Sequence, residues 1–172
     1  IERMQGWGRQ LGLTPLRDTG YVAVKATLAV LVALVPVSVI AVLGVATGAE
    51  GSARAWALSL LAILAGAWVF ALFGLVVGLA FRTEGAVNAI GGIVVVLGFL
   101  GNIFIPLSGT LLDIARFTPL YGYVALVRHP ITEGVVPDNA GGTAAVDPLW
   151  LPLLNLGAWA LILGLVATWL VR

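Results

Sequence analysis

The sequence predicts an all-α polytopic membrane protein. Of its 172 residues, 60% are hydrophobic and only 10% are charged, whereas an ordinary soluble domain carries about 25% charged residues. The mean hydropathy is +1.08. A small soluble core has no room for so many apolar side chains, and a disordered chain contains far fewer of them. We therefore expect most of the apolar residues to lie in a bilayer.

The same composition excludes several functions. Nine basic and eight acidic residues leave a formal charge of +1, which gives no electrostatic reason to bind nucleic acid. The chain has no cysteine and a single histidine, His129, so it cannot form a disulfide or a multi-histidine metal site. It also lacks a Walker motif, HExxH and GxSxG. We predict no catalytic residue, no metal site and no bound cofactor in this chain.

The first element, residues 1–18, is predicted to be an amphipathic helix that does not cross the membrane. Thr14 and Pro15 then give a second helix start, with Thr14 as the N-cap and Pro15 at the first helical position. A helix of this kind either rests on lipid headgroups or docks on a partner protein, and its residues alone leave both interpretations open. Its apolar residues recur at spacings of three and four, which marks one helix face: Ile1, Met4, Trp7 and Leu11.

Four segments are long and apolar enough to cross a bilayer, because about 20 apolar residues span a hydrocarbon core of about 30 Å. None of them alternates polar and apolar residues as a membrane β-barrel strand does. Their one charged residue, Lys25, lies near an end, where its side chain can reach the interface. The predicted spans are residues 21–46, 55–81, 86–105 and 149–171.

The Lys and Arg residues predict the orientation. An even number of spans places both ends of the chain on the same side. Six Lys and Arg residues then lie on that side and three on the other. Since positively charged residues concentrate on the cytoplasmic side, both ends are predicted to be cytoplasmic.

The region between the last two spans is predicted to form a re-entrant outer hairpin. Residues 106–128 are mostly apolar but are interrupted by proline and glycine, and neither half is long enough to cross the membrane. Asp113 and Arg116 are three residues apart, so they can pair on one helix face. The following residues, 129–148, are rich in turn-forming residues and are predicted to be an exposed extracellular loop.

One face of the third span is unusual because it carries two amides. Amide side chains are unlikely neighbours for lipid, so this face should contact protein or line a cavity. Bonding between helices and lining of a translocation pathway both fit the residues. At 100° per residue, five positions fall within about 80° of one another: Asn88, Gly92, Val95, Phe99 and Asn102.

Two GxxxG pairs, Gly44 with Gly48 and Gly74 with Gly78, indicate close helix packing. Their spacing fits either helix packing within the chain or an interface between two copies of it.

Two segments resemble ABC-2 type transporter permeases. Residues 2–16, ERMQGWGRQLGLTPL, are similar to the coupling helix of that family, which typically ends in L-x-x-TPL. Residues 101–128 are similar to its span end, its short outer hairpin and the TPL-x-Y segment that closes with Arg. The matching residues are Glu2, Arg3, Gly6, Arg9, Gln10, Leu11, Thr14, Pro15 and Leu16 in the first segment, and Gly101, Phe104, Pro106, Pro119, Leu120, Tyr121 and Arg128 in the second.

The resemblance covers essentially the whole chain and agrees in the order of the elements. It implies a permease subunit in a bacterial plasma membrane that pairs with a separate ATP-binding subunit, two copies of each. That partner would bind ATP and Mg. The family resemblance also implies two further spans before the coupling helix, so the sequence is expected to be a piece of a longer protein.

The resemblance further implies a role for each candidate site. The coupling helix would dock on the ATP-binding subunit, the face of residues 88–102 would border the substrate pathway, and the hairpin with Pro106, Pro119 and Tyr121 would cap the exit. The expected substrate is a lipophilic compound or drug that leaves the cytoplasm. Polysaccharide and lipid exporters share this architecture, and a scaffold or sensor without transport is a further alternative.

Overall fold

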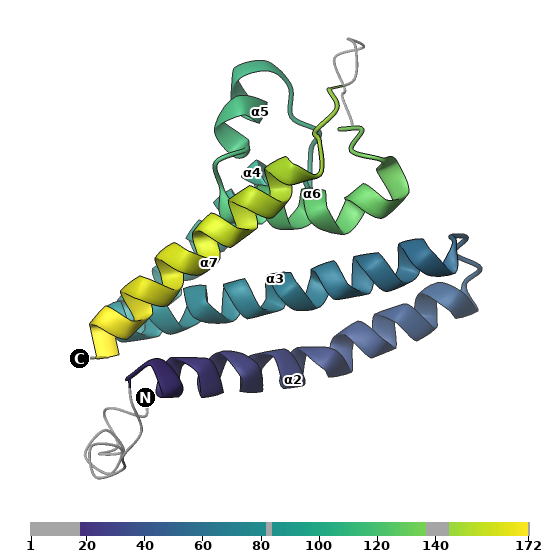
Figure 1. Ribbon diagram of the computed structural model, residues 1–172. Helices are drawn as coiled ribbons and strands as arrows, with labels where there is room; N and C mark the ends of the chain where they lie inside the picture. Colours follow the sequence, from purple (N-terminus) through teal and green to yellow (C-terminus); the bar gives the residue numbers. More distant parts are fainter. Residues whose placement is uncertain (1–17, 82–83, 137–144, 172) are drawn as a thin grey trace.

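A computed structural model describes residues 18–81, 84–136 and 145–171. Within these residues the chain forms α-helices and one isolated antiparallel bridge between Val135 and Val146, and no strands. The predicted all-α fold is confirmed. The amphipathic helix predicted over residues 1–18 lies almost entirely outside the described residues. The helices, labelled as in Figure 1, are α2 (Asp18–Ala46), α3 (Ala53–Ala80), α4 (Glu84–Leu100), α5 (Gly109–Ala115), α6 (Pro119–Thr132) and α7 (Trp150–Val171).

Three of these helices are long and apolar enough to cross a membrane. They are Thr19–Ala46, Ala53–Ala80 and Trp150–Val171. They agree with three of the four predicted spans. Pro36 lies inside α2, and the helix continues past it to Ala46. Ser52 caps the start of α3, because its hydroxyl accepts a hydrogen bond from the Ala55 amide at 3.1 Å.

The third predicted span, residues 86–105, is a shorter helix in the structure. α4 has 17 residues and ends at Leu100, which gives a length of about 25 Å at 1.5 Å per residue. Residues 101–105 form a turn and bends in place of the last helical turn. The existence of a helix here is confirmed, whereas its end was predicted five residues too late.

α3 is the central helix of the described part. It packs against α2, α6 and α7, while α4 packs mainly against α5 and α6. Figure 1 shows α2 and α3 running side by side in opposite directions, with α7 crossing them at an angle. The start of α2 and the end of α7 lie at the same end of this assembly, and the turn between α2 and α3 lies at the opposite end.

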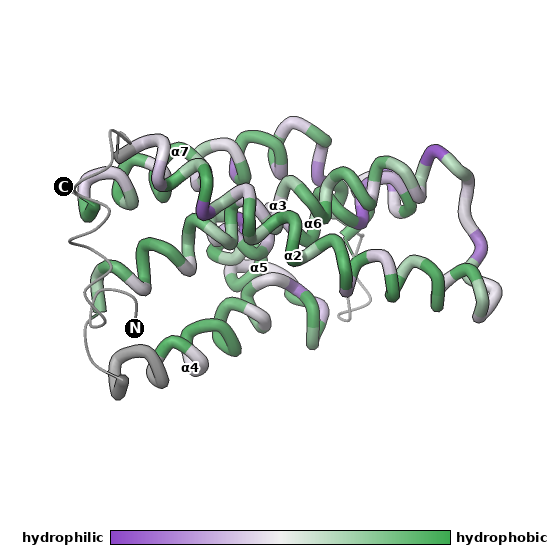
Figure 2. Tube along the Cα trace, turned by 90° about the horizontal axis from the view of Figure 1, so that it is seen from below, coloured by the Kyte–Doolittle hydropathy of each residue, from purple (hydrophilic) through white to green (hydrophobic). Residues whose placement is uncertain are grey.

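The core of the described residues is small, and many large apolar side chains are exposed. One buried cluster joins α2, α3 and α7, and a second joins α5 and α6 to the segment after α6. No residue in the most apolar stretch of α2 is buried. Figure 2 shows hydrophobic residues along the helices and hydrophilic ones mainly at their ends and connections. Such a surface is stable in lipid, where apolar exposure carries no cost.

The predicted outer hairpin consists of α5 and α6, and α6 runs antiparallel to α3. The ring of Tyr123, near the start of α6, lies 5.7 Å from that of Phe70, beyond the middle of α3. One turn later, the Val127 carbonyl accepts a hydrogen bond of 2.9 Å from the Ser59 hydroxyl, near the start of α3. α6 is thus folded back along α3.

The prediction of an exposed loop over residues 129–148 is wrong at both ends. Residues 129–132 form the last turn of α6, and the helix includes Pro130. At the other end, Asp147 is only 3% exposed. Its amide donates to the Gly134 carbonyl at 2.8 Å, and the Val136 amide donates to the Ala145 carbonyl at 2.8 Å. These two hydrogen bonds hold the ends of the segment together.

Candidate functional site

The end of α4 is a helix-stop motif built around Asn102. Asn102 adopts φ 57°, a left-handed conformation that asparagine tolerates better than most residues. Its amide donates to Phe99 at 3.1 Å, and the Ile103 amide donates to Gly98 at 3.4 Å, which is the Schellman pattern. Asn102 is therefore not on the helical face of α4, and the predicted alignment of five residues is wrong for it.

Asn102 instead connects α4 to the hairpin of α5 and α6. It is 6% exposed, and its side-chain oxygen accepts a hydrogen bond of 2.7 Å from the Leu107 amide. The Arg128 guanidinium on α6 donates to its carbonyl at 2.9 Å. A Cβ at the preceding Gly101 would lie 2.9 Å from Leu120, so α4 and α6 meet closely here. The side-chain oxygen of Asn102 is thus satisfied by nearby backbone of its own connection and not by another helix.

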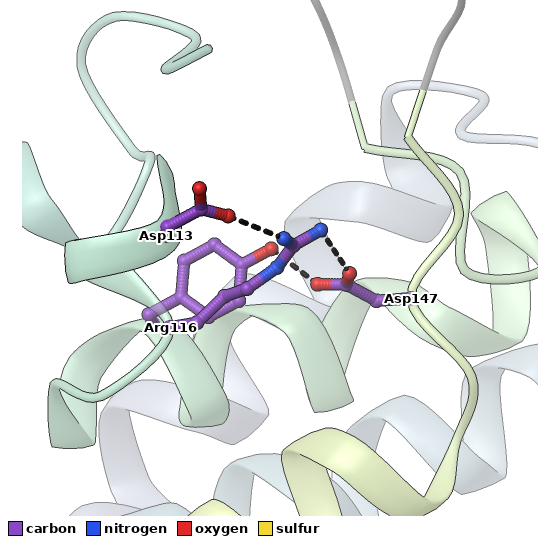
Figure 3. A network of polar contacts seen from close by, with 4 residues as sticks. Asp113, Arg116 and Asp147 are labelled. Carbon is purple, nitrogen blue, oxygen red and sulfur yellow. Dashed lines mark hydrogen bonds and ion pairs between the residues drawn. The ribbon is translucent and has the colours of Figure 1, made fainter. Parts of the chain in front are cut away.

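The corner between α5 and α6 carries a charged network in which Asp147 is buried. Arg116 donates to Asp147 at 2.7 Å and to Asp113 at 2.9 Å, and the Tyr121 hydroxyl donates to the other oxygen of Asp147 (Figure 3). The predicted Asp113–Arg116 pair is confirmed. Thr118 positions Tyr121, because its hydroxyl accepts from the Tyr121 amide at 3.3 Å and donates to Ala115 at 2.7 Å.

The same contacts shift the pKa values of Tyr121 and Arg116. Burial raises the pKa of Tyr121, and its bond to Asp147 raises it further, so the phenol stays neutral. Burial acts to lower the pKa of Arg116, but the bond and the charge of Asp147 outweigh it and raise that pKa. Tyr121 therefore stays neutral and Arg116 stays positively charged over the pH range in which cells live.

The same corner is tied to α7. The Asn155 amide group donates to the Arg116 carbonyl at 2.7 Å, and the Trp159 indole donates to the Phe117 carbonyl at 2.9 Å. A Cβ at Gly122 would overlap the Asn155 side chain, so this close approach requires glycine. These contacts satisfy carbonyls that the end of α5 would otherwise leave unpaired.

Only a small space remains inside the corner. A cavity of about 30 Å³ lies between α6 and the ends of the loop that follows it, lined among others by Asn102, Arg128 and Asp147. This volume can hold a water molecule but not a transported substrate. Within the described ranges no group of His, Cys, Asp or Glu could hold a metal ion.

The predicted pathway face on α4 is open in its described part. Val95 is 53% exposed and Phe99 is 45% exposed. A Cβ at Gly92 would contact nothing within 4 Å. Asn88 lies in α4, but its side chain is outside the described set. Phe99 also packs against Phe104, with ring centroids 5.1 Å apart. Gly92, Val95 and Phe99 thus share an uncovered face, without Asn102.

The predicted hairpin residues are found at the turns of the hairpin. Pro106 lies in the connection before α5, Pro119 is the first residue of α6 and is buried, and Tyr121 is 2% exposed. Pro119 suits this position because the first helical residue needs no amide hydrogen.

The glycines of the two GxxxG pairs do not pack as the spacing predicted. Gly44 packs against Trp56, but Gly48 lies in a turn with φ 79°. Cβ atoms at Gly74 and Gly78 would contact nothing within 4 Å in the described structure. The closest glycine contact on α3 is instead at Gly66, where a Cβ would overlap the Tyr123 ring.

Comparison with known protein families matches residues 2–169 to the family described as ABC-2 family transporter protein. The chain belongs to the ABC-2 family. No curated protein and no solved structure matches it. Membership shows that this ABC-2 protein is the permease component of a transporter, and it implies association with an ABC ATP-binding subunit. Together with the three spanning helices, it makes the ABC-2 protein a multi-pass membrane protein.

The predicted coupling residues of this ABC-2 protein fall outside the described structure. They are Glu2, Arg3, Gly6, Arg9, Gln10, Leu11, Thr14 and Pro15, and their roles stay predictions.

Sequence reasoning missed two polar residues of the ABC-2 protein that hold the corner together. Asp147 was assigned to an exposed loop and Asn155 to a plain span. One signal was present: Asn155 is the single amide in an otherwise apolar segment, and such residues usually face protein. Asp147 gave no comparable signal, because its partners Arg116 and Tyr121 lie 31 and 26 residues earlier.

Proposed function

We propose that this ABC-2 permease exports a lipophilic substrate from the cytoplasm and that a separate ATP-binding subunit supplies the energy. The observation that carries the proposal is the open face of α4 in a chain of this family. Gly92, Val95 and Phe99 are uncovered in a helix that ends beside the outer hairpin. The family membership supports a transport role, and the apolar character of the face supports a lipophilic substrate.

The chemistry of the α4 face fits a flat apolar molecule. Phe99 presents an aromatic ring for stacking, and Gly92 leaves room next to it. The outer end of the face is closed by the Schellman turn at Asn102 and by the hairpin behind it. In the proposed mechanism two permease copies enclose the substrate between such faces. Movement of the hairpin then opens the exit.

Replacing Phe99 with alanine should change which compounds are exported. Loss of the ring removes a stacking surface and is expected to alter resistance to aromatic compounds by about threefold to tenfold, with resistance to non-aromatic ones preserved. The measurement is a resistance profile normalised to the amount of permease in the membrane.

Val94→Ala is the matched control for Phe99→Ala. Val94 is 50% exposed on the same helix, but it lies about 140° around the axis from Phe99. It should leave the profile unchanged. A uniform loss of resistance to all compounds in the Phe99 variant, together with less folded protein, would assign Phe99 to packing and remove the case for a pathway here.

Changes in the coupling segment should separate ATP turnover from export. Arg9→Glu and Gly6→Trp are expected to abolish export while the protein still inserts and its partner still hydrolyses ATP, because both alter a face that would dock on the ATP-binding subunit. Transport and ATPase rates measured together in proteoliposomes test this. Arg54→Glu, at an exposed position near the start of α3, is the matched control. Normal export by both variants would support a helix that only rests on lipid.

A further inference from the structure

A groove of about 650 Å³ lies along the N-terminal half of α7, next to the corner between α5 and α6. One wall is an apolar strip of α7 that includes Leu154, Ala158 and Ile162. The other wall is the corner itself, with Asp113, Arg116 and Phe117. No α4 residue lines the groove, so it is separate from the proposed pathway face.

The walls of this groove are fixed to each other. The hydrogen bonds from Asn155 and Trp159 to the carbonyls of Arg116 and Phe117 join α7 to the corner along the floor. Two aromatic rings remain largely uncovered at the groove, since Phe117 is 80% exposed and Trp150 is 63% exposed. The site is therefore formed before any ligand binds, which lowers the entropic cost of binding.

The charge in the groove favours a cation. Asp113 and Arg116 line the groove, and the Arg116 guanidinium also bonds Asp147, which is buried outside it. The three residues together have a formal charge of −1 (Figure 3). The Asp113 side chain is 67% exposed. Among the described residues only one of its oxygens is hydrogen-bonded, and the other is open to a ligand. No other charged residue of the described ranges lines the groove.

We infer that this groove binds a lipophilic cation, such as an alkylammonium compound. The cationic head would lie at Asp113, between the rings of Phe117 and Trp150. A carboxylate supplies the opposite charge, and aromatic faces attract cations directly. The hydrocarbon part would lie along Leu154, Ala158 and Ile162 on α7. An anionic amphiphile of the same length is opposed by the net negative charge. The inference concerns binding alone and does not depend on the proposed direction of transport.

Equilibrium binding of radiolabelled dodecyltrimethylammonium tests the inference. The full-length permease is placed in phosphatidylglycerol nanodiscs, and binding to empty nanodiscs is subtracted. Asp113→Asn keeps the shape of the side chain and removes its charge, and Arg116 still has Asp147, so the fold should be retained. We expect about fivefold weaker binding. Glu133→Gln, which removes an exposed charge outside the groove, should bind like the wild type.

A second variant keeps the test independent of Asp113. Phe117→Leu retains an apolar side chain but removes a ring, so it should weaken binding of the cation by about threefold. Equal affinities for Asp113→Asn and Glu133→Gln would overturn the inference, as would equally strong competition by dodecyl sulfate. Loss of binding on addition of phosphatidylethanolamine would also overturn it, because a membrane lipid would then be the occupant.

Discussion

Replacing Asp147 with alanine is expected to destabilise the protein by about 3 kcal/mol. Asp147 is buried and bonds both Arg116 and the Tyr121 hydroxyl. Its removal leaves a neutral phenol without an acceptor and a partly buried guanidinium with one counter-ion fewer. The segment before α7 also loses its side-chain link to the hairpin. The measurement is the free energy of unfolding by SDS in mixed micelles, followed by tryptophan fluorescence.

Asp113→Ala is the matched control, since Asp113 bonds the same guanidinium at 2.9 Å but is 67% exposed. Exposed ion pairs contribute little, so this change should cost less than about 1 kcal/mol. Tyr121→Phe should fall between the two, because Asp147 then keeps Arg116. Equal losses of unfolding free energy for Asp147→Ala and Asp113→Ala would mean that burial does not decide how much each carboxylate stabilises the protein.

Replacing Gly66 with valine is expected to separate the hairpin from α3 and to destabilise the protein by about 2–3 kcal/mol. A Cβ at Gly66 would overlap the Tyr123 ring, and that ring also packs against Phe70. The ring has no alternative position without loss of this contact. The unfolding assay used for Asp147 reports the loss, and easier proteolysis of the hairpin should accompany it.

Gly74→Val is the control on the same helix, because a Cβ at Gly74 would contact nothing within 4 Å. It should be close to neutral. The combination of Gly66→Val with Tyr123→Ala should be less destabilised than the sum of the two single changes, since the second change removes the overlap caused by the first. Additive losses would show that Gly66 and Tyr123 do not interact in the membrane.

The long helices could be predicted from the sequence, and the helix ends could not. The extents of α2, α3 and α7 follow from continuous apolar runs, because an apolar run of this length forms a spanning helix in lipid. The end of α4 depends on Asn102 in a left-handed conformation and on Arg128 from a distant helix. The apolar pattern continues through residues 103–105, so it carries no sign of the stop.

The hairpin shows the same division between local and distant causes. Its two helices were predicted because Pro and Gly interrupt an apolar segment and Asp113 lies three residues from Arg116. The burial of Asp147 was not, because it depends on pairing between residues far apart in the chain. The glycine that packs most closely was missed for the same reason: GxxxG spacing singled out Gly74 and Gly78, whereas a bulky ring from α6 requires Gly66.

The separation of Arg116 and Asp147 along the chain has a consequence for biosynthesis. Asp147 leaves the ribosome 31 residues after Arg116, a delay of about 2–6 s at ordinary rates of translation. During that time the arginine has only its near neighbour Asp113 as a counter-ion. α6, too short to span, has α3 beside it but lacks α7. The hairpin can reach its final packing only when α7 is being made. Insertion of this region therefore finishes late, and synthesis of the C-terminal helix completes it.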